Sequence, residues 1–170
     1  MKKRIVIAAV VLLIMSILVI VFVDHSSKIV GYDGLITKAR EEIKLADTST
    51  IEIAIAGKST ISNNTHLFWF ITGNEHQMSS CHPMEFIELE NNEYEYIHTY
   101  NPLPRGKDIY ALLWHSGYSF LVNNPNCKTI KICDYRGDTI IPVDEIPFVY
   151  YFVGFPGEYA FYDKDGNIIS

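Results

Sequence analysis

Cysteine is scarce in this sequence, and the short motifs that identify common catalytic and metal sites are absent. The 170 residues include three Cys, and neither Cys-x-x-Cys nor His-Glu-x-x-His occurs, although converging zinc ligands commonly show these spacings. There is also no Gly-x-Ser-x-Gly, the turn that presents a nucleophilic serine in many hydrolases. We therefore predict no catalytic residue, no metal site and no cofactor.

Acidic residues are absent from the start of the chain. All 20 Asp and Glu lie from Asp24 onward, whereas three of the 14 Lys and Arg stand at positions 2 to 4. The remaining 11 basic residues oppose 20 acidic ones, which leaves a formal charge of 11 − 20 = −9 on that part of the chain. Such an acidic domain repels phosphate backbones and anionic lipid surfaces, so we do not expect a nucleic-acid partner.

Polar residues are almost absent from the segment Ile5–Val23. Its 19 residues carry no charge, and Ser16 is the single polar one. As a helix they extend about 28 Å, close to the hydrocarbon thickness of a bilayer. Basic residues precede this run and Asp24 follows it, which places the N-terminus in the cytoplasm. The sequence therefore predicts a single-pass protein of the cell membrane, with a cytoplasmic start at 1–4, a transmembrane helix at 5–23 in the lipid bilayer and an extracytoplasmic domain at 24–170.

A cleaved signal peptide is the alternative interpretation of the same run. The apolar region of a signal peptide spans about 7–15 residues and ends in small residues that a peptidase recognises. Here Leu18–Val23 are all bulky, and no Ala-x-Ala pattern precedes Asp24. We therefore favour an uncleaved anchor.

One helix is predicted shortly after the membrane segment. Apolar residues recur there at intervals of three and four, which places them on one helix face. These residues are Tyr32, Leu35, Ile36, Ala39, Ile43 and Ala46. Asp33 is placed to cap the start of the helix, and Lys38 with Glu42 forms an i,i+4 pair on another face.

Internal repeats, low-complexity stretches and interdomain linkers are also absent, so residues 24–170 are expected to form one domain. After Asp47, short β-rich runs alternate with turns about every ten residues, as in an antiparallel meander. The expected strands cover 51–55, 66–72, 85–90, 93–100, 109–114, 118–122, 129–133, 139–143, 148–153 and 159–162. Asn91-Asn92 joins two of them as a hairpin. The predicted fold class is α+β, in which one juxtamembrane helix precedes an antiparallel sheet or partly closed barrel of eight to ten strands.

The three cysteines leave at least one thiol unpaired within the chain. If residues 128–133 form one strand, Cys127 and Cys133 lie about 20 Å apart, since a strand rises about 3.3 Å per residue. A disulfide requires about 4.4–6.8 Å between Cα atoms. Three free thiols are therefore the favoured state, and a disulfide from Cys81 to either of the others is the alternative.

Cys81 and His82 are adjacent and raise the question of a zinc site completed by other histidines. Zinc requires three or four converging ligands, and no further pair with ligand spacing is present. Pro83 and the polar residues around Cys81 are more typical of a solvated loop. We therefore interpret this stretch as a loop.

Two features are candidate binding surfaces. Five glutamates from Glu85 to Glu95 crowd one hairpin, which indicates a solvated sheet face or, alternatively, a site for a cation or a basic peptide. Aromatic residues occupy both faces of 148–153, as in a buried central strand or, alternatively, an interface. The loop after this strand is expected to present Phe155 to solvent. The candidate binding residues are Glu88, Tyr96, Phe152 and Phe155.

These features predict a non-catalytic extracytoplasmic domain that binds a protein or peptide at the cell surface. An envelope-complex subunit, a sensor and an immunity-type protein all fit this description. The alternative is a membrane-tethered hydrolase of peptide or envelope polymer, which requires Cys81 or Ser116 within hydrogen-bond reach of a His. A third hypothesis is a ligand cavity inside a barrel lined by Tyr94, Tyr96 and Tyr150.

Overall fold

The computed structural model describes residues 29–45, 50–62, 64–74, 77–106 and 108–169. The predicted cytoplasmic start and transmembrane helix, residues 1–23, lie outside these ranges. Within the ranges, no helix has the length and apolar content needed to cross a membrane. The described chain is mostly β-strand with one α-helix, which confirms the β-rich character expected from the sequence.

The helix and strands follow the predicted order, and all ten predicted strands overlap an observed one. Strand β1 (Ile29–Val30) leads into helix α2 (Gly31–Ile43). The first long strands are β2 (Glu52–Ile61), β3 (Thr65–Asn74), β4 (Gln77–Glu88) and β5 (Glu93–Thr99), and the 3-10 turn η1 (Glu90–Asn92) joins β4 to β5 at the predicted hairpin. The remaining strands are β6 (Leu103–Pro104), β7 (Ile109–Trp114), β8 (Gly117–Val122), β9 (Thr129–Asp134), β10 (Gly137–Pro142), β11 (Phe148–Val153) and β12 (Glu158–Tyr162).

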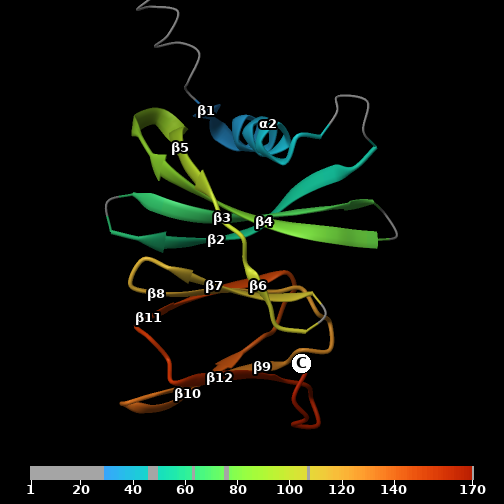
Figure 1. Ribbon diagram of the computed structural model, residues 1–170, viewed down its shortest axis with the longest axis vertical. Helices are drawn as coiled ribbons and strands as arrows, with labels where there is room; N and C mark the ends of the chain where they lie inside the picture. The colour runs from blue at the N-terminus through green and yellow to red at the C-terminus, as the bar shows by residue number, and fades with distance from the viewer. Residues whose placement is uncertain (1–28, 46–49, 63, 75–76, 107, 170) are drawn as a thin grey trace, which may run out of the picture.

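The strands form three antiparallel sheets rather than a single sheet or barrel. The strand orders are β1-β5-β4-β3-β2 in the first sheet, β11-β8-β7-β6 in the second and β10-β9-β12 in the third. Figure 1 shows α2 and the three sheets as successive layers, with the first sheet curved around α2 as half a barrel. Each layer therefore has a face to bury against the next.

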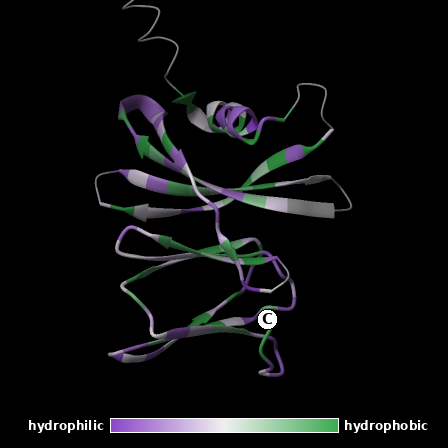
Figure 2. Ribbon diagram, viewed as in Figure 1, coloured by the Kyte–Doolittle hydropathy of each residue, from purple (hydrophilic) through white to green (hydrophobic). Residues whose placement is uncertain are grey.

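Each interface between layers has its own apolar core, because strand residues point alternately to the two faces of a sheet. On β3, Phe68 and Phe70 pack against α2. Leu67 and Trp69, on the opposite face of β3, pack against the second sheet. A third core between the second and third sheets includes Ile109, Phe120, Val122, Ile130, Ile132, Phe152 and Phe161. Figure 2 shows the apolar residues concentrated on the strands of all three sheets.

Strand β11 is covered on both faces, as its aromatic pattern predicted. Tyr150 and Phe152 pack into the core against the third sheet, whereas Val149 and Tyr151 pack toward the first sheet. β11 is nevertheless an edge strand, since β8 is the one described strand that pairs with it. Two-sided burial therefore comes from the stacking of layers and not from a central position within a sheet.

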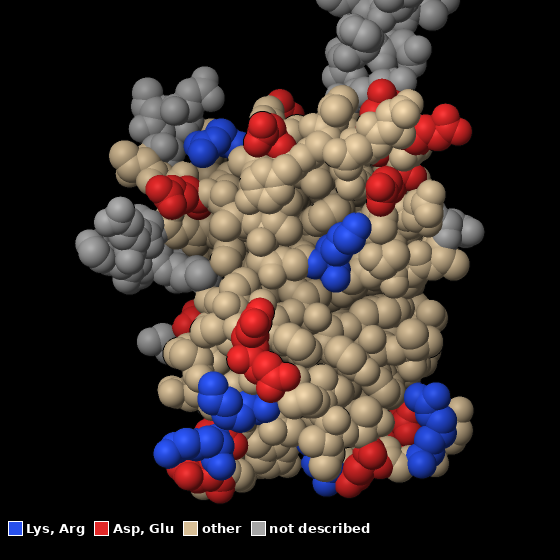
Figure 3. Space-filling view, turned by 180° about the vertical axis from the view of Figure 1, so that it is seen from behind, with Lys and Arg blue, Asp and Glu red and all other residues tan. Residues whose placement is uncertain are grey.

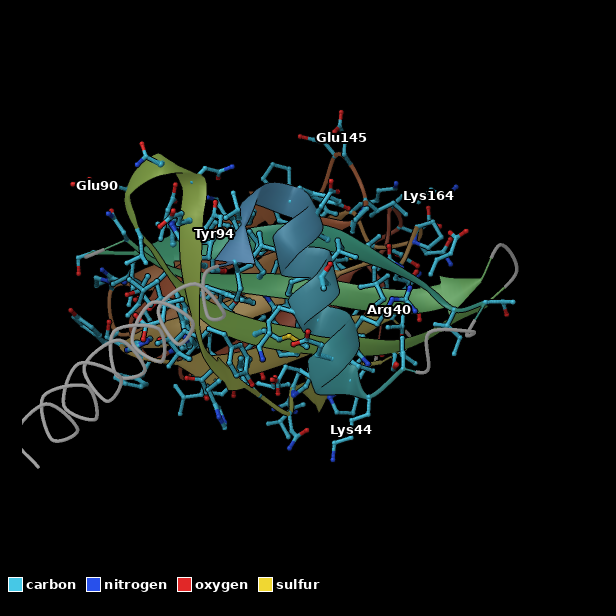
Figure 4. The ribbon with its side chains drawn as sticks, turned by 90° about the horizontal axis from the view of Figure 1, so that it is seen from above. Arg40, Lys44, Glu90, Tyr94, Glu145 and Lys164 are labelled. Carbon is cyan, nitrogen blue, oxygen red and sulfur yellow. The ribbon has the colours of Figure 1, made fainter. Side chains whose placement is uncertain are left out.

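Helix α2 packs its predicted apolar face on the first sheet through buried Leu35 and Ala39. The expected ion pair is present, with Lys38 Nζ 2.7 Å from Glu42 Oε1. The prediction that Asp33 caps the helix is wrong, because the helix begins at Gly31 and Asp33 lies inside its first turn. Figure 4 looks down on α2 as it crosses the strands, with Tyr94 beside it and Lys44 at its C-terminal end.

The stretch around Cys81 is a strand and not the predicted loop. It lies within β4, where Cys81 pairs with Ile71 and His82 pairs with Phe70 across the ladder to β3. Cys81 is buried between the first two sheets, where it packs in one apolar cluster with Ile71 of β3 and Leu121 of β8. All three cysteines are free thiols, as favoured from the sequence.

Candidate functional site

Two of the predicted binding residues lie on the first sheet and make intramolecular contacts. Glu88 Oε2 lies 2.7 Å from His66 Nε2 at the end of β4. Tyr96 packs in the core beneath α2, and its Oη donates to Glu42 Oε2 at 3.1 Å. Both side chains therefore hold the first layer together.

The other two lie at the far end of β11, in the second and third layers. Phe152 is 5% exposed within the core between those sheets, so its predicted place on a binding surface is wrong. Phe155 is 65% exposed in the loop between β11 and β12, as expected. The four residues thus do not form one surface. The third hypothesis, a cavity lined by Tyr94, Tyr96 and Tyr150, does not fit the described residues, since Tyr94 packs against α2 and Tyr150 against the third sheet.

A buried polar cluster surrounds Glu85, which is 5% exposed where the first and second sheets meet. Tyr100 Oη donates a hydrogen bond to Glu85 Oε2. Trp114 Nε1 donates to the same oxygen at 3.1 Å, and His115 Nε2 lies 2.9 Å from Oε1. The interpretation of all five hairpin glutamates as a solvated face is wrong for Glu85, because stacking of the second sheet covers it.

The electrostatics of Glu85 indicate a structural role. Burial raises the pKa of its carboxyl, but the hydrogen bonds from Tyr100, His115 and Trp114 outweigh burial and lower the pKa below its ordinary value. The carboxylate therefore stays ionised at neutral pH with its oxygens already engaged. It joins the first sheet to β7 of the second and has little capacity left for a ligand.

The residues required by the hydrolase hypothesis are not arranged as a nucleophile and base. Burial raises the pKa of the Cys81 thiol, which opposes formation of the reactive thiolate. Ser116 is exposed in the turn between β7 and β8. Within the described ranges, neither Cys81 Sγ nor Ser116 Oγ hydrogen-bonds to a His or a carboxylate, and no group of three or more His, Cys, Asp and Glu is placed to hold a metal.

A serine and a histidine do meet on β4, in a pair that was not among the candidates from the sequence. Ser80 Oγ lies 2.8 Å from His82 Nε2 and 2.6 Å from Thr72 Oγ1. Burial lowers the pKa of His82, so the ring is neutral at pH 7, as a general base must be. Among the described residues, no carboxylate contacts His82 to orient it.

An open groove of about 550 Å³ lies where the edges of the second and third sheets meet. One wall follows β6, and the other is β12 with the C-terminal segment. The lining residues are Pro104, Arg105, Gly106, Glu158, Tyr159, Ala160, Phe161, Ile168 and Ile169. Tyr159, Phe161 and Ile169 belong to the third core, so the groove opens onto the apolar interior between two sheets.

The backbone of β12 faces this groove with unused hydrogen-bonding groups. β12 is an edge of its sheet, and alternate residues of an antiparallel strand direct their N–H and C=O to opposite sides. The Phe161 carbonyl accepts from the Ile169 N–H at 2.8 Å, so Phe161 points away from β9. Tyr159, two residues earlier, therefore also directs its N–H and C=O away from β9, to a side where no described strand pairs with it.

Arg105 is the cation among the described residues that line the groove. Its guanidinium lies 5.2 Å from the centroid of the Tyr159 ring. On the face shown in Figure 3, Lys and Arg gather mainly at the lower end, beside acidic groups. Lys131 of β9 is paired with Asp138 at 2.7 Å, and Arg136, in the turn between β9 and β10, is paired with Asp134 at 2.6 Å. Arg105 differs, since no described carboxylate lies within ion-pair distance of it.

The groove was not predicted from the sequence, in which residues 102–106 fall between the expected strands 93–100 and 109–114. The one local signal was an arginine within a Pro- and Gly-rich turn. The opposite wall lies more than fifty residues later in the chain, so no spacing rule joins the two. The chain matches no protein-family model, no curated protein and no solved structure, so the geometry of the groove is the basis for interpreting its function.

Proposed function

We propose that this protein is a membrane-anchored extracytoplasmic domain that binds an extended segment of a protein or peptide partner and does not catalyse a reaction. The run Ile5–Val23 is the anchor. The bound segment lies in the groove as an added strand beside β12. An envelope-complex subunit, a sensor and an immunity-type protein remain the roles that fit such a domain.

The free edge of β12 inside the groove is the observation that carries this proposal. Extended peptides add to exposed sheet edges because backbone hydrogen bonds supply affinity, while pockets beside the edge select alternate side chains. The Tyr159 N–H and C=O supply the backbone partners. Phe161 and Ile169 supply an apolar surface for a side chain of the added strand.

The test starts from seven-residue peptides selected from a randomised library on the full-length protein in detergent micelles. Each residue of a selected peptide is then N-methylated in turn, which removes one backbone donor and keeps the side chain. Strand addition predicts that the position whose N–H donates to the Tyr159 carbonyl loses about tenfold in affinity, while its neighbours, whose N–H points away, do not. Equal tolerance at every position contradicts strand addition.

Two variants of Tyr159 provide a matched comparison on the protein side. Tyr159→Ala deletes the side chain and keeps the N–H, whereas Tyr159→Pro deletes both. Proline is tolerated on an edge strand where its missing N–H faces outward, so both variants are expected to fold. The selected peptides should bind Tyr159→Ala more tightly than Tyr159→Pro, with circular dichroism confirming equal strand content.

A membrane-tethered hydrolase is the second candidate, and the contact between Ser80 and His82 is the observation that favours it. A fluorophosphonate probe, which labels activated serines, tests it on the full-length protein. Labelling that disappears in Ser80→Ala and persists in Ser116→Ala supports a hydrolase. The proposed binding domain predicts no labelling of either serine.

A further inference from the structure

We infer that the groove recognises the free C-terminus of a peptide, with the terminal carboxylate bound by Arg105 and the Tyr159 hydroxyl. This inference rests on the proposed peptide-binding function and names the part of the partner chain that is bound. Three features of the groove support it: its blocked end, its hydrogen-bond donors and its apolar surface.

The edge of β12 is open at Tyr159 and blocked shortly beyond it. The C-terminal segment returns along this edge, where Ile168 bridges to Tyr162 and Ile169 N–H donates to the Phe161 carbonyl. A strand added at Tyr159 therefore meets Ile169 within two residues. A segment that continues through the groove along this edge is therefore blocked by Ile169. A chain that runs parallel to β12 and ends beside Tyr159 is not blocked.

The polar side chains that face the groove are donors. The guanidinium of Arg105 has donors only, and no described carboxylate pairs with it. The Tyr159 Oη is buried beside the Arg105 side chain, which can only donate to it, so the hydroxyl proton has no acceptor among the described residues. Burial raises the pKa of Tyr159, and the charge and hydrogen bonding of Arg105 oppose this only in part, so the hydroxyl keeps its proton at neutral pH.

Such a pair of donors selects an anionic acceptor over the ammonium of a free N-terminus. A planar carboxylate matches the guanidinium fork, which forms two parallel hydrogen bonds with it. Glu158, the acidic residue of the lining, does not oppose this, because it alternates with Tyr159 and its side chain points to the exposed face of β12. The net acidity of the domain disfavours segments rich in Asp or Glu, so a single terminal carboxylate is the better ligand.

The apolar part of the lining predicts the nature of the last side chain. Pro104, Phe161, Ile168 and Ile169 surround the space beside Tyr159. Ile168 is exposed, so binding of an apolar side chain against it removes apolar surface from water. We therefore expect Val, Leu, Ile or Phe at the C-terminus of preferred peptides.

The test uses two libraries of seven-residue peptides that differ only in the terminal group, free carboxylate or carboxamide. Full-length protein in detergent micelles is incubated with each, and fluorescence anisotropy gives the Kd of the retained sequences. Carboxylate peptides with an apolar last residue should bind about ten- to a hundredfold more tightly than their carboxamide forms. Arg105→Gln should abolish this difference. Lys58→Gln, an equal charge change on the first sheet, should preserve it.

The two ways in which this can fail are distinguishable. In the first, N-methylation at one position weakens binding, but the carboxylate and carboxamide forms of the peptide bind equally well. This result overturns recognition of the C-terminus and leaves strand addition in place. If neither library yields a peptide that binds wild type more tightly than Tyr159→Pro, both the inference and the proposed function are overturned. A carboxylate preference that survives Arg105→Gln overturns the assignment of the site.

Discussion

Replacing Glu85 by Ala is expected to destabilise the fold by about 3–5 kcal/mol, the usual cost of removing one partner from a buried ionic network. A hydrogen bond to a charged group contributes about 1.5–3 kcal/mol, and a buried donor left without an acceptor costs about 1–3 kcal/mol. Trp114 is 1% exposed, so its Nε1 cannot turn to water when the carboxylate is removed. His115 has a side chain that is 44% exposed and is readily rehydrated, so most of the loss arises at Tyr100 and Trp114.

The same carboxylate makes stability depend on pH. Hydrogen bonding outweighs burial, so the pKa of Glu85 in the folded protein lies below the ordinary value of 4.5. As the pH falls, the unfolded chain therefore binds the proton first. The stabilisation is complete above about pH 5 and is lost as the pH falls through the folded pKa. Glu85→Gln does not titrate, so it should lose less stability than wild type between about pH 5 and pH 3.

Urea unfolding followed by tryptophan fluorescence measures both effects, because Trp69 and Trp114 are both buried beside the interface that Glu85 joins. Glu95→Ala is the control, since Glu95 is an exposed carboxylate on the paired strand. It is expected to change the free energy of unfolding by less than about 0.5 kcal/mol. A Glu85→Ala effect below about 1 kcal/mol, or a difference between wild type and Glu85→Gln that is independent of pH, would refute this account of the interface.

Three further predictions concern other buried groups. Ser119 Oγ lies 2.7 Å from both Ser59 Oγ and Trp69 Nε1 between the first two sheets, so Ser119→Ala should cost about 1–3 kcal/mol in urea unfolding. An effect equal to that of Ser116→Ala, in the exposed turn of the same hairpin, contradicts this. Burial, together with the nearby Lys58 charge, lowers the pKa of His66, so the unfolded chain binds a proton before the folded protein does. Wild type should therefore lose stability relative to His66→Gln between about pH 7 and pH 5. Free energies of unfolding that change equally with pH in the two proteins would argue against it. Iodoacetamide should modify half-buried Cys133 in the native protein, but Cys81 and Cys127, which are buried, only after unfolding. Mass spectrometry measures the modification, and equal modification rates for all three cysteines would be inconsistent with the fold.

Elements governed by local periodicity were predictable from the sequence. Leu35 and Ala39 define the buried face of α2 because helix geometry alone brings residues three and four apart together. Strand β11 was predicted as buried on both faces because its aromatics occupy both parities. The cap at Asp33 failed because β1 leads the chain into the helix two residues earlier, at Gly31.

Features that depend on which strands pair were not predictable in this way. The alternation of side chains between the two faces of β5 is interrupted at a register irregularity. Phe86 pairs with Tyr96, but the preceding residue of β4, Glu85, pairs with His98, so Ile97 is skipped. Tyr100 consequently reaches Glu85 instead of sharing a face with Tyr96. The groove likewise forms only because β6 and β12 end up at neighbouring edges of two different sheets, which no local pattern encodes.

The central claim is that the edge of β12 receives an added strand, and the exchange rate of one backbone amide tests it most directly. Hydrogen exchange measured by NMR on the full-length protein in micelles, with and without a saturating selected peptide, reports on the Tyr159 N–H. We predict that exchange at Tyr159 slows by about tenfold or more on binding, whereas Ala160, which pairs with Lys131 of β9, changes little. An unchanged Tyr159 exchange rate in the saturated complex would contradict the account.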